Sequence, residues 1–185
     1  MPGHHPVPYA RICYRLQILR EQDALALLGL PGVASRERSA GAASRTYFGR
    51  FDAPGFPVLY AAEEVATCEA EVAHHLVAHY LELSARKPRD FRYQLLQVPL
   101  AGHFDDLHRA DRKGLCAPSP SAYPAARRFA WAACQAGLDG LLYPSPRKTG
   151  GHCVARFLLG GIRIQTDAAG FRSFHWSGKR LTRVP

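Results

Sequence analysis

The sequence predicts an α+β fold in a single domain, and three observations support this expectation. Strand-like segments outnumber helical ones, irregular connections join them, and the regular strand–helix alternation of a doubly wound sheet is absent. With 185 residues, of which 47% are hydrophobic, the chain is long enough for one substantial core and short for two. We therefore expect a flexible leader over residues 1–9 and one folded domain over residues 10–185.

The first predicted strand covers residues 10–19, where apolar and polar side chains alternate with a period of two. This register places Arg15 on the face opposite the main apolar set. Residues 23–28 have the pattern of a short helix that Gly29 ends. Residues 31–45 are rich in Gly, Ala, Ser and Arg, a composition typical of an exposed loop.

The central stretch combines a turn, a strand and a helix. A Pro-Gly pair marks the turn, and residues 56–60 form a short apolar strand that ends at Tyr60. Glu63 and Glu64 then fall in the first turn of a helix, where carboxylates suit the positive end of the helix dipole. The apolar stripe of this helix has spacings of about 3.6 residues and comprises Val65, Val72, Leu76, Tyr80 and Leu83.

The second half is predicted to be rich in strands, with one further helix. Residues 91–100 have a strand pattern, residues 103–113 form a charged loop, and residues 125–136 form a helix that Gly137 closes. The last strands are expected at residues 141–143, 154–159, 162–165 and 171–176.

Charge and cysteine usage narrow the class of protein. Lys and Arg total 24 against 15 acidic residues, and the resulting net charge of +9 favours anionic partners. The basic residues are scattered along the sequence, which gives little support to a nucleic-acid groove. The five cysteines include no CxxC pair, which argues against a disulfide framework or zinc ribbon and favours a reducing cytoplasm. No apolar run approaches ~18–20 residues, so we expect no membrane span.

Three residues outside the helix are candidates for ligand binding. Arg50 can clamp a phosphate with two parallel hydrogen bonds, although an exposed loop arginine is the simpler interpretation of this residue alone. Tyr60 can stack on an aromatic ligand with its hydroxyl free, or it can be a core tyrosine. Ser145 lacks the GxSxG elbow of a serine hydrolase and suits a rigidly held binding hydroxyl. The Gly-Gly loop that follows Arg147 can cradle phosphate but lacks the P-loop spacing.

Two glutamates compete for the role of a functional carboxylate. With about 100° of rotation per residue, Glu69 falls inside the apolar stripe and Glu71 lies off its edge. Periodicity alone therefore favours Glu69. His75 and His79 have the spacing of a helical metal pair, but the HExxH motif is absent and we expect no metal.

Several ordered blocks make the sequence similar to the RES domain family, which is named for its arginine, glutamate and serine. The family strand that ends in Tyr-Arg corresponds to Tyr14 and Arg15. The family pattern Gly-Arg-Trp-Asn-x-x-Gly corresponds to residues 49–55. Phe51 and Asp52 stand here at the Trp-Asn positions.

The remaining blocks carry the glutamate and the serine. The family tyrosine corresponds to Tyr60, and the glutamate of Ala-Glu-Val, eleven residues later, corresponds to Glu71. The block Tyr-Pro-Ser-x-Arg with Gly-Gly-x-Cys-Val-Ala-x-Phe corresponds to residues 143–157, which places the serine at Ser145. The similarity extends over residues 10–165.

The resemblance implies a fold like that of the ADP-ribosyltransferase toxins: a split mixed or antiparallel β core with flanking helices and an NAD cleft. It implies a toxin that breaks the nicotinamide–ribose bond of NAD by hydrolysis or phosphorolysis, with NAD as substrate and no further cofactor. A helix-turn-helix antitoxin is the implied partner, and contact with nucleic acid is expected only through it. The alternatives are a mono-ADP-ribosyltransferase that modifies a protein, an inactive relative that binds the antitoxin, and, more remotely, a basic nucleic-acid-binding module.

The resemblance also implies roles for five residues. Glu71 stabilises the oxocarbenium-like transition state, and Arg15 and Arg50 hold the pyrophosphate. Tyr60 packs against nicotinamide or ribose. Ser145 forms a hydrogen bond to the nicotinamide end or to the ribose. The spacing of the family motif thus selects Glu71 over the glutamate that periodicity favours.

Overall fold

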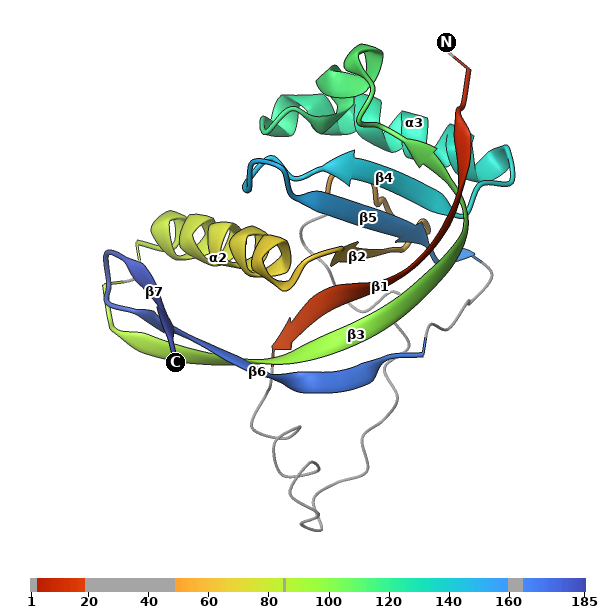
Figure 1. Ribbon diagram of the computed structural model, residues 1–185. Helices are drawn as coiled ribbons and strands as arrows, with labels where there is room; N and C mark the ends of the chain where they lie inside the picture. Colours follow the sequence, from red (N-terminus) through yellow and green to blue (C-terminus); the bar gives the residue numbers. More distant parts are fainter. Residues whose placement is uncertain (1–2, 19–48, 85, 160–164) are drawn as a thin grey trace.

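The computed structural model describes residues 3–18, 49–84, 86–159 and 165–185. The helix expected at residues 23–28, the loop expected at residues 31–45 and most of the strand expected at residues 162–165 lie outside the described residues. Within the described ranges, the strands form one seven-stranded mixed sheet in the order β1-β2-β5-β4-β3-β6-β7 (Figure 1). The elements are β1 (Pro6–Ile18), β2 (Val58–Ala62), α2 (Val65–Glu82), β3 (Arg89–Asp106), η1 (Ala110–Cys116), η2 (Pro120–Ala122), α3 (Tyr123–Gln135), β4 (Gly140–Pro144), β5 (His152–Phe157), β6 (Asp167–Trp176) and β7 (Leu181–Val184).

The long strand β3 organises the sheet through both of its edges. β1 runs antiparallel along one edge, from Pro6 opposite Asp105 to Ile18 opposite Tyr93. The other edge is divided, because its first half pairs with β6 and residues 104–106 pair in parallel with β4. β1 also pairs with β2, and β2 leads through β5 to β4, so these strands close a circuit (Figure 1).

Two hydrophobic clusters hold these elements together. The smaller cluster joins side chains of the strands in the circuit: Tyr9, Cys13, Ala61, Leu96, Val98, Leu100, Phe104 and Val154. The larger cluster lies between the sheet and the helices, and α3 contributes the buried residues Ala126, Phe129, Ala130 and Ala133. Figure 1 shows α2 between β5 and the β6–β7 hairpin. The predicted stripe of α2 packs on the larger cluster from Val65 to Tyr80, whereas Leu83 is exposed.

Two expectations about loops are wrong for a shared reason. Residues 6–9, expected in a flexible leader, begin β1, and residues 103–106, expected in a charged loop, end β3. These two segments pair with each other. The buried Asp105 carboxylate accepts hydrogen bonds from His4 Nδ1 at 2.7 Å and from the backbone N–H of His5 at 3.0 Å. A polar sequence therefore continues as a strand with a buried carboxylate, because a distant segment supplies the donors for Asp105.

The α+β class, with a mixed β core and flanking helices, is confirmed. The helix at α3 and the strands β2, β4, β5 and β6 occur where the sequence predicted them, within a few residues, whereas β7 was not expected. In the part of the chain that the structure describes, no helix combines the length and apolarity needed to cross a membrane.

Phe104→Ala should lower the free energy of unfolding by about 3–5 kcal/mol, because it empties a fully buried aromatic position in the smaller cluster. Ile12→Ala changes a residue of the neighbouring strand that is 56% exposed, and should cost less than about 0.5 kcal/mol. Urea denaturation measures both variants. Equal losses would contradict the place of Phe104 in the core.

Candidate active site

The loop between β4 and β5 lies directly against the first turn of α2. Ser145 follows β4, and its backbone N–H donates to the carbonyl of Gly151 at 2.8 Å, which closes the loop. A Cβ on Gly151 would lie 2.5 Å from Thr67 Oγ1, so the approach requires glycine. Gly150, at a φ of +73°, makes the turn that allows it. Glu71 lies one helical turn beyond Thr67 on the same face and comes within reach of Ser145.

The contact between Ser145 and Glu71 is the centre of the candidate site. Ser145 Oγ donates to Glu71 Oε1 at 2.5 Å. The same hydroxyl accepts the backbone N–H groups of Arg147 and Lys148, at 3.1 and 3.0 Å. Cys153 Sγ donates to the same carboxylate oxygen over 3.9 Å. Burial, followed by the charge of Glu71, raises the pKa of the Cys153 thiol, which therefore stays protonated as a donor.

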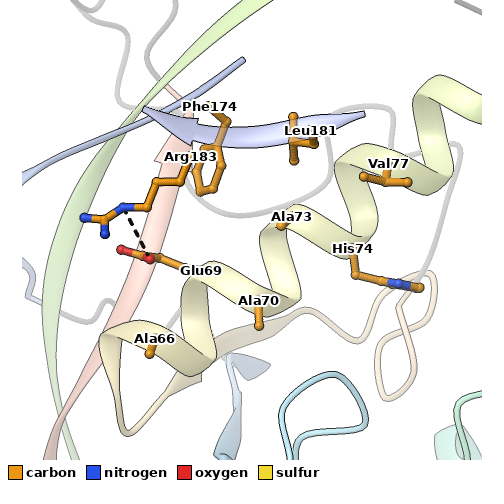
Figure 2. A pocket seen from close by; sticks show the side chains of 9 residues that line it. All are labelled: Ala66, Glu69, Ala70, Ala73, His74, Val77, Phe174, Leu181 and Arg183. Carbon is orange, nitrogen blue, oxygen red and sulfur yellow. Dashed lines mark ion pairs between the residues drawn. The ribbon is translucent and has the colours of Figure 1, made fainter. Parts of the chain in front are cut away.

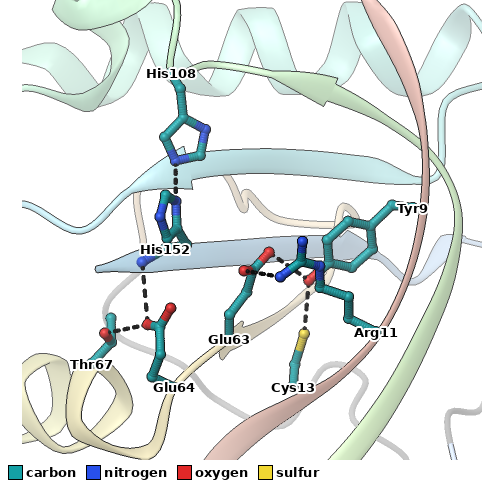
Figure 3. A network of polar contacts seen from close by, with 8 residues as sticks. All are labelled: Tyr9, Arg11, Cys13, Glu63, Glu64, Thr67, His108 and His152. Carbon is teal, nitrogen blue, oxygen red and sulfur yellow. Dashed lines mark hydrogen bonds and ion pairs between the residues drawn. The ribbon is translucent and has the colours of Figure 1, made fainter. Parts of the chain in front are cut away.

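The two glutamates that precede α2 serve the fold. Glu63 accepts a hydrogen bond from Tyr9 Oη at 3.0 Å (Figure 3). Glu64 accepts from Thr67 Oγ1 at 2.6 Å and from the backbone N–H of His152 at 3.4 Å. These contacts tie the start of α2 to β1 and β5, and so fix the helix relative to the β4–β5 loop.

Glu69, the residue that periodicity favours, points toward the β6–β7 hairpin (Figure 2). Its carboxylate pairs with Arg172 of β6 at 2.6 Å and with Arg183 of β7 at 3.6 Å. It lines an open groove of about 470 Å³ between α2 and the hairpin, together with a row of alanines (Figure 2). The hydrogen bond to Ser145 belongs instead to Glu71.

The hydroxyl of Tyr60 fixes the loop that carries Arg50. Tyr60 Oη donates to Asp52 Oδ1 at 2.8 Å and accepts the backbone N–H of Phe51 at 2.9 Å. A Cβ on Gly49 would lie 2.6 Å from Asp52 Oδ1, so this packing also requires glycine. Burial, and then the charge of Asp52, raises the pKa of Tyr60 well above its usual value. The hydroxyl is therefore used within the protein, as in the core-tyrosine alternative.

Arg50 is buried, and its guanidinium binds the protein's own backbone. Its Nη1 donates to the carbonyls of Leu115 and Ala117, at 3.1 and 2.5 Å. The guanidinium also stacks over Tyr123, with its carbon 5.0 Å from the ring centroid. Nη1 is the donor in both hydrogen bonds. The other edge of the guanidinium, formed by Nε and Nη2, is not used in these two bonds.

Tyr143 lies among the residues that the sequence singled out. Burial raises the pKa of its phenol; Tyr60 and Glu71 raise it further, whereas Arg50 lowers it. Ser145 follows two residues later, immediately after the end of the same strand. The charges of Glu71 and Arg50 and the phenol of Tyr60 therefore act on one buried ring, and Ser145 is bound to Glu71.

Arg147 adds a cation to the β4–β5 loop, and its Nη2 donates to the carbonyl of Pro118 at 3.5 Å. Desolvation lowers the pKa of His75; the charge of Glu71 opposes this change, and the charges of Arg147 and Arg50 add to it. The net lowering keeps His75 neutral at pH 7. Arg147 Nε is buried and has no hydrogen-bond partner among the described residues.

Arg15, the fifth predicted residue, lies beside Tyr60 and the first turn of α2. Its Nη1 donates to the carbonyl of Tyr60 at 2.8 Å, which joins β1 to β2. Burial raises the pKa of the neighbouring Cys68 to about 11, and the charge of Arg15 opposes this rise.

Sequence reasoning gave no role to Tyr143, Cys153 or Thr67. Tyr143 and Cys153 are paired residues on the neighbouring strands β4 and β5. A predicted antiparallel pairing of these two strands would have indicated that the two side chains lie close together. Thr67 follows Glu64 by three residues at a helix start, which is a spacing used for capping contacts. Among the described residues, no group of three or more His, Cys, Asp or Glu side chains is arranged to hold a metal ion.

A family model for the RES domain matches residues 27–169. The chain belongs to the RES domain family. A search of the curated proteins finds no match. The crystal structure of the M. tuberculosis MbcT–MbcA toxin–antitoxin complex contains a chain of similar fold, with a TM-score of 0.54 and 18% identity. The match covers 89% of this RES chain and 87% of that chain, and at this identity it supports the fold alone.

In this RES domain, Gly151→Ala should lower the free energy of unfolding by about 1–3 kcal/mol, because the added methyl group would overlap Thr67. Adding Thr67→Ala removes both Thr67 atoms that lie within 3 Å of the new Cβ, so the double variant should lose less than the sum of the single variants. Gly114→Ala, with open space around its Cβ, is the matched control. Strictly additive losses, measured by urea unfolding, would contradict the close approach.

Proposed function

We propose that this RES protein is the toxin of a toxin–antitoxin pair and breaks the nicotinamide–ribose bond of NAD. The observation that carries the proposal is the 2.5 Å hydrogen bond from Ser145 to Glu71. The backbone of Arg147 donates to the same hydroxyl, and the guanidinium groups of Arg50 and Arg147 reach the adjacent carbonyls of Ala117 and Pro118. An oriented carboxylate beside cations suits a substrate in which positive charge develops on a sugar attached to a pyrophosphate. The family match and the toxin–antitoxin complex of similar fold support this interpretation.

Glu71 is assigned the stabilisation of the sugar cation. When the bond breaks, the nicotinamide nitrogen keeps the electron pair and leaves as neutral nicotinamide. Positive charge then develops on the ribose carbon and its ring oxygen, and a carboxylate fixed nearby lowers the energy of this state. Water or phosphate attacks the same carbon and loses a proton, which yields ADP-ribose or its 1-phosphate.

Ser145 is assigned the orientation of Glu71, in place of the expected contact to nicotinamide or ribose. A hydroxyl has one proton to donate and two lone pairs to accept with. The proton of Ser145 goes to Glu71, and the backbone N–H groups of Arg147 and Lys148 occupy the acceptor directions. The serine therefore has no capacity left for the substrate unless it releases one of these partners.

Arg147 and Arg50 are assigned the binding of the pyrophosphate of NAD. Arg147 Nε is buried without a partner in the described part of the chain, and an unsatisfied buried donor is costly unless a ligand completes it. Arg50 can add its Nε–Nη2 edge, since Nη1 binds the protein backbone. Arg15 would support this arrangement from β1, and the ring of Tyr60 would border the nicotinamide or ribose.

An antitoxin is the partner that we propose, because the related fold was solved in a toxin–antitoxin complex. A helix-turn-helix antitoxin and action in the cytoplasm follow from the family resemblance and from the location of the NAD pool. Binding of the antitoxin over the site would keep the NAD of the host intact.

Product analysis with NAD and increasing phosphate tests the reaction. We expect NAD to disappear with release of nicotinamide, and free ADP-ribose or ADP-ribose 1-phosphate identifies water or phosphate as the acceptor. ADP-ribose attached to protein would identify the transferase alternative. NAD that stays intact with and without phosphate, and in the presence of acceptor proteins, would overturn the proposal.

Glu71→Gln should lower the rate of NAD cleavage by about 10²–10³-fold, because the amide keeps the shape of the side chain but not its charge. Glu69→Gln is the matched control on the same helix. It breaks the ion pair with Arg172 and should leave the rate within a few-fold. Initial rates of nicotinamide release, with circular dichroism to verify folding, measure both variants. An active Glu71→Gln beside an inactive Glu69→Gln would assign the role to Glu69.

A further inference from the structure

A second functional surface lies at the far end of α2 from the Ser145–Glu71 contact. Residues 82–92 and 177–183 together contain seven Lys and Arg residues and two acids, Glu82 and Asp90. These 18 residues therefore carry +5 of the net charge of +9. The cations, all of them exposed, define the basic corner: Arg86, Lys87, Arg89, Arg92, Lys179, Arg180 and Arg183.

Strand pairing brings the two halves of the basic corner together. Arg89 at the start of β3 pairs with Trp176 at the end of β6, and Trp176 pairs in turn with Leu181 of β7. The turn between β6 and β7 then lies against the chain before β3, since a Cβ on Gly178 would be 2.1 Å from the carbonyl oxygen of Arg86. Figure 1 shows the end of α2, the start of β3 and the β6–β7 hairpin at one corner of the molecule.

The basic corner is concave. A pocket of about 240 Å³ lies between the end of α2 and the β6–β7 turn, and Ser84, Arg86 and Lys179 are among the residues that line it. Trp176, which is buried, forms part of its wall. The Ser84 hydroxyl and the two cations that line this small pocket can together bind one phosphate group.

Two arginines of β3, which lie on opposite faces of the sheet, are held by aromatic rings. The Arg92 guanidinium lies over Phe171, with its carbon 4.4 Å from the ring centroid, and that of Arg89 lies 5.8 Å from the centroid of Phe91. Stacking orients a guanidinium and leaves its N–H edge for a ligand. Asp90 is engaged with His175 Nδ1 at 2.7 Å, so one of the two acids within the corner has a partner of its own. Among the cations, Arg183 is paired with Glu69 at 3.6 Å.

This distribution favours closely spaced phosphates over an acidic protein. The centres of protein–protein interfaces are depleted in charge and enriched in apolar and aromatic side chains. In the basic corner, Arg86 and Lys179 line the pocket and the exposed Arg180 follows Lys179 in the chain. Duplex DNA presents about one negative charge per 1.7 Å of its axis. We propose that the basic corner binds the phosphate backbone of a nucleic-acid duplex, independently of the catalytic site.

Fluorescence anisotropy with a labelled duplex of about 20 base pairs and arbitrary sequence tests this proposal. If about five cations contact phosphates, affinity should fall several hundred-fold between about 50 and 200 mM salt. The variant R86Q/K179Q/R180Q should reduce the slope of log affinity against log salt by about 3 and weaken binding at low salt. NAD cleavage by this variant should equal that of the unmodified protein, which separates this test from that of the catalytic site.

The matched control removes the same charge elsewhere. The variant R109Q/K113Q/R128Q changes three exposed cations of η1, its flank and α3, and should retain the salt slope within about 1. Equal weakening by both triple variants would overturn the proposal, because binding would then follow net charge alone. No binding at about 50 mM salt would also overturn it, as would displacement of the duplex by polyglutamate at equal charge, which would indicate an acidic protein partner.

Discussion

The lack of a side chain at Gly151 sets the geometry on which the candidate site depends. The β4–β5 loop can touch α2 only because nothing fills the space beside Thr67, and Thr67 in turn bonds to Glu64 at the start of the helix. This contact fixes where along the helix the loop lies. A helix presents one residue to a given direction about every turn, so the carboxylate that meets Ser145 is the one a turn further on, Glu71.

Distant segments supply the partners of the polar groups around the site. Ser145 and Glu71 are 74 positions apart in the sequence, and Arg50 reaches carbonyls 65 and 67 positions away. The closed circuit of strands holds these segments at fixed distances, because each strand from β1 to β5 has neighbours on both edges over part of its length. In the NAD cleavage that we propose, a carboxylate oriented before the substrate binds needs little rearrangement. Such preorganisation is the condition for electrostatic stabilisation of a transition state.

The local elements were predictable because they follow from periodicity and turn residues, as with α2 and β4. The choice between Glu69 and Glu71 was not predictable from periodicity, because α2 is covered on two faces. One face packs on the core and the β4–β5 loop, and the other meets the β6–β7 hairpin, where Arg172 pairs with Glu69 from 103 residues away. A single apolar stripe cannot describe such a helix. The family spacing selected Glu71, whereas the structural uses of Tyr60 and Arg50 depend on partners that no local pattern reveals.

The arginines show the same dependence on the fold. In the sequence they are scattered, and their net charge suggests only a general attraction to anions. In the structure Arg50 is buried on backbone carbonyls and an aromatic ring, and Arg172 is paired with Glu69. Cations that are paired with an acid, or hydrogen-bonded to the protein's own backbone, contribute little to the binding of a partner. Among the described residues, the excess that remains exposed is concentrated where β3, β6 and β7 meet, about 16 Å along α2 from Glu71. The carboxylate that we propose as catalytic therefore lies near the start of α2, and the basic corner lies beyond its end.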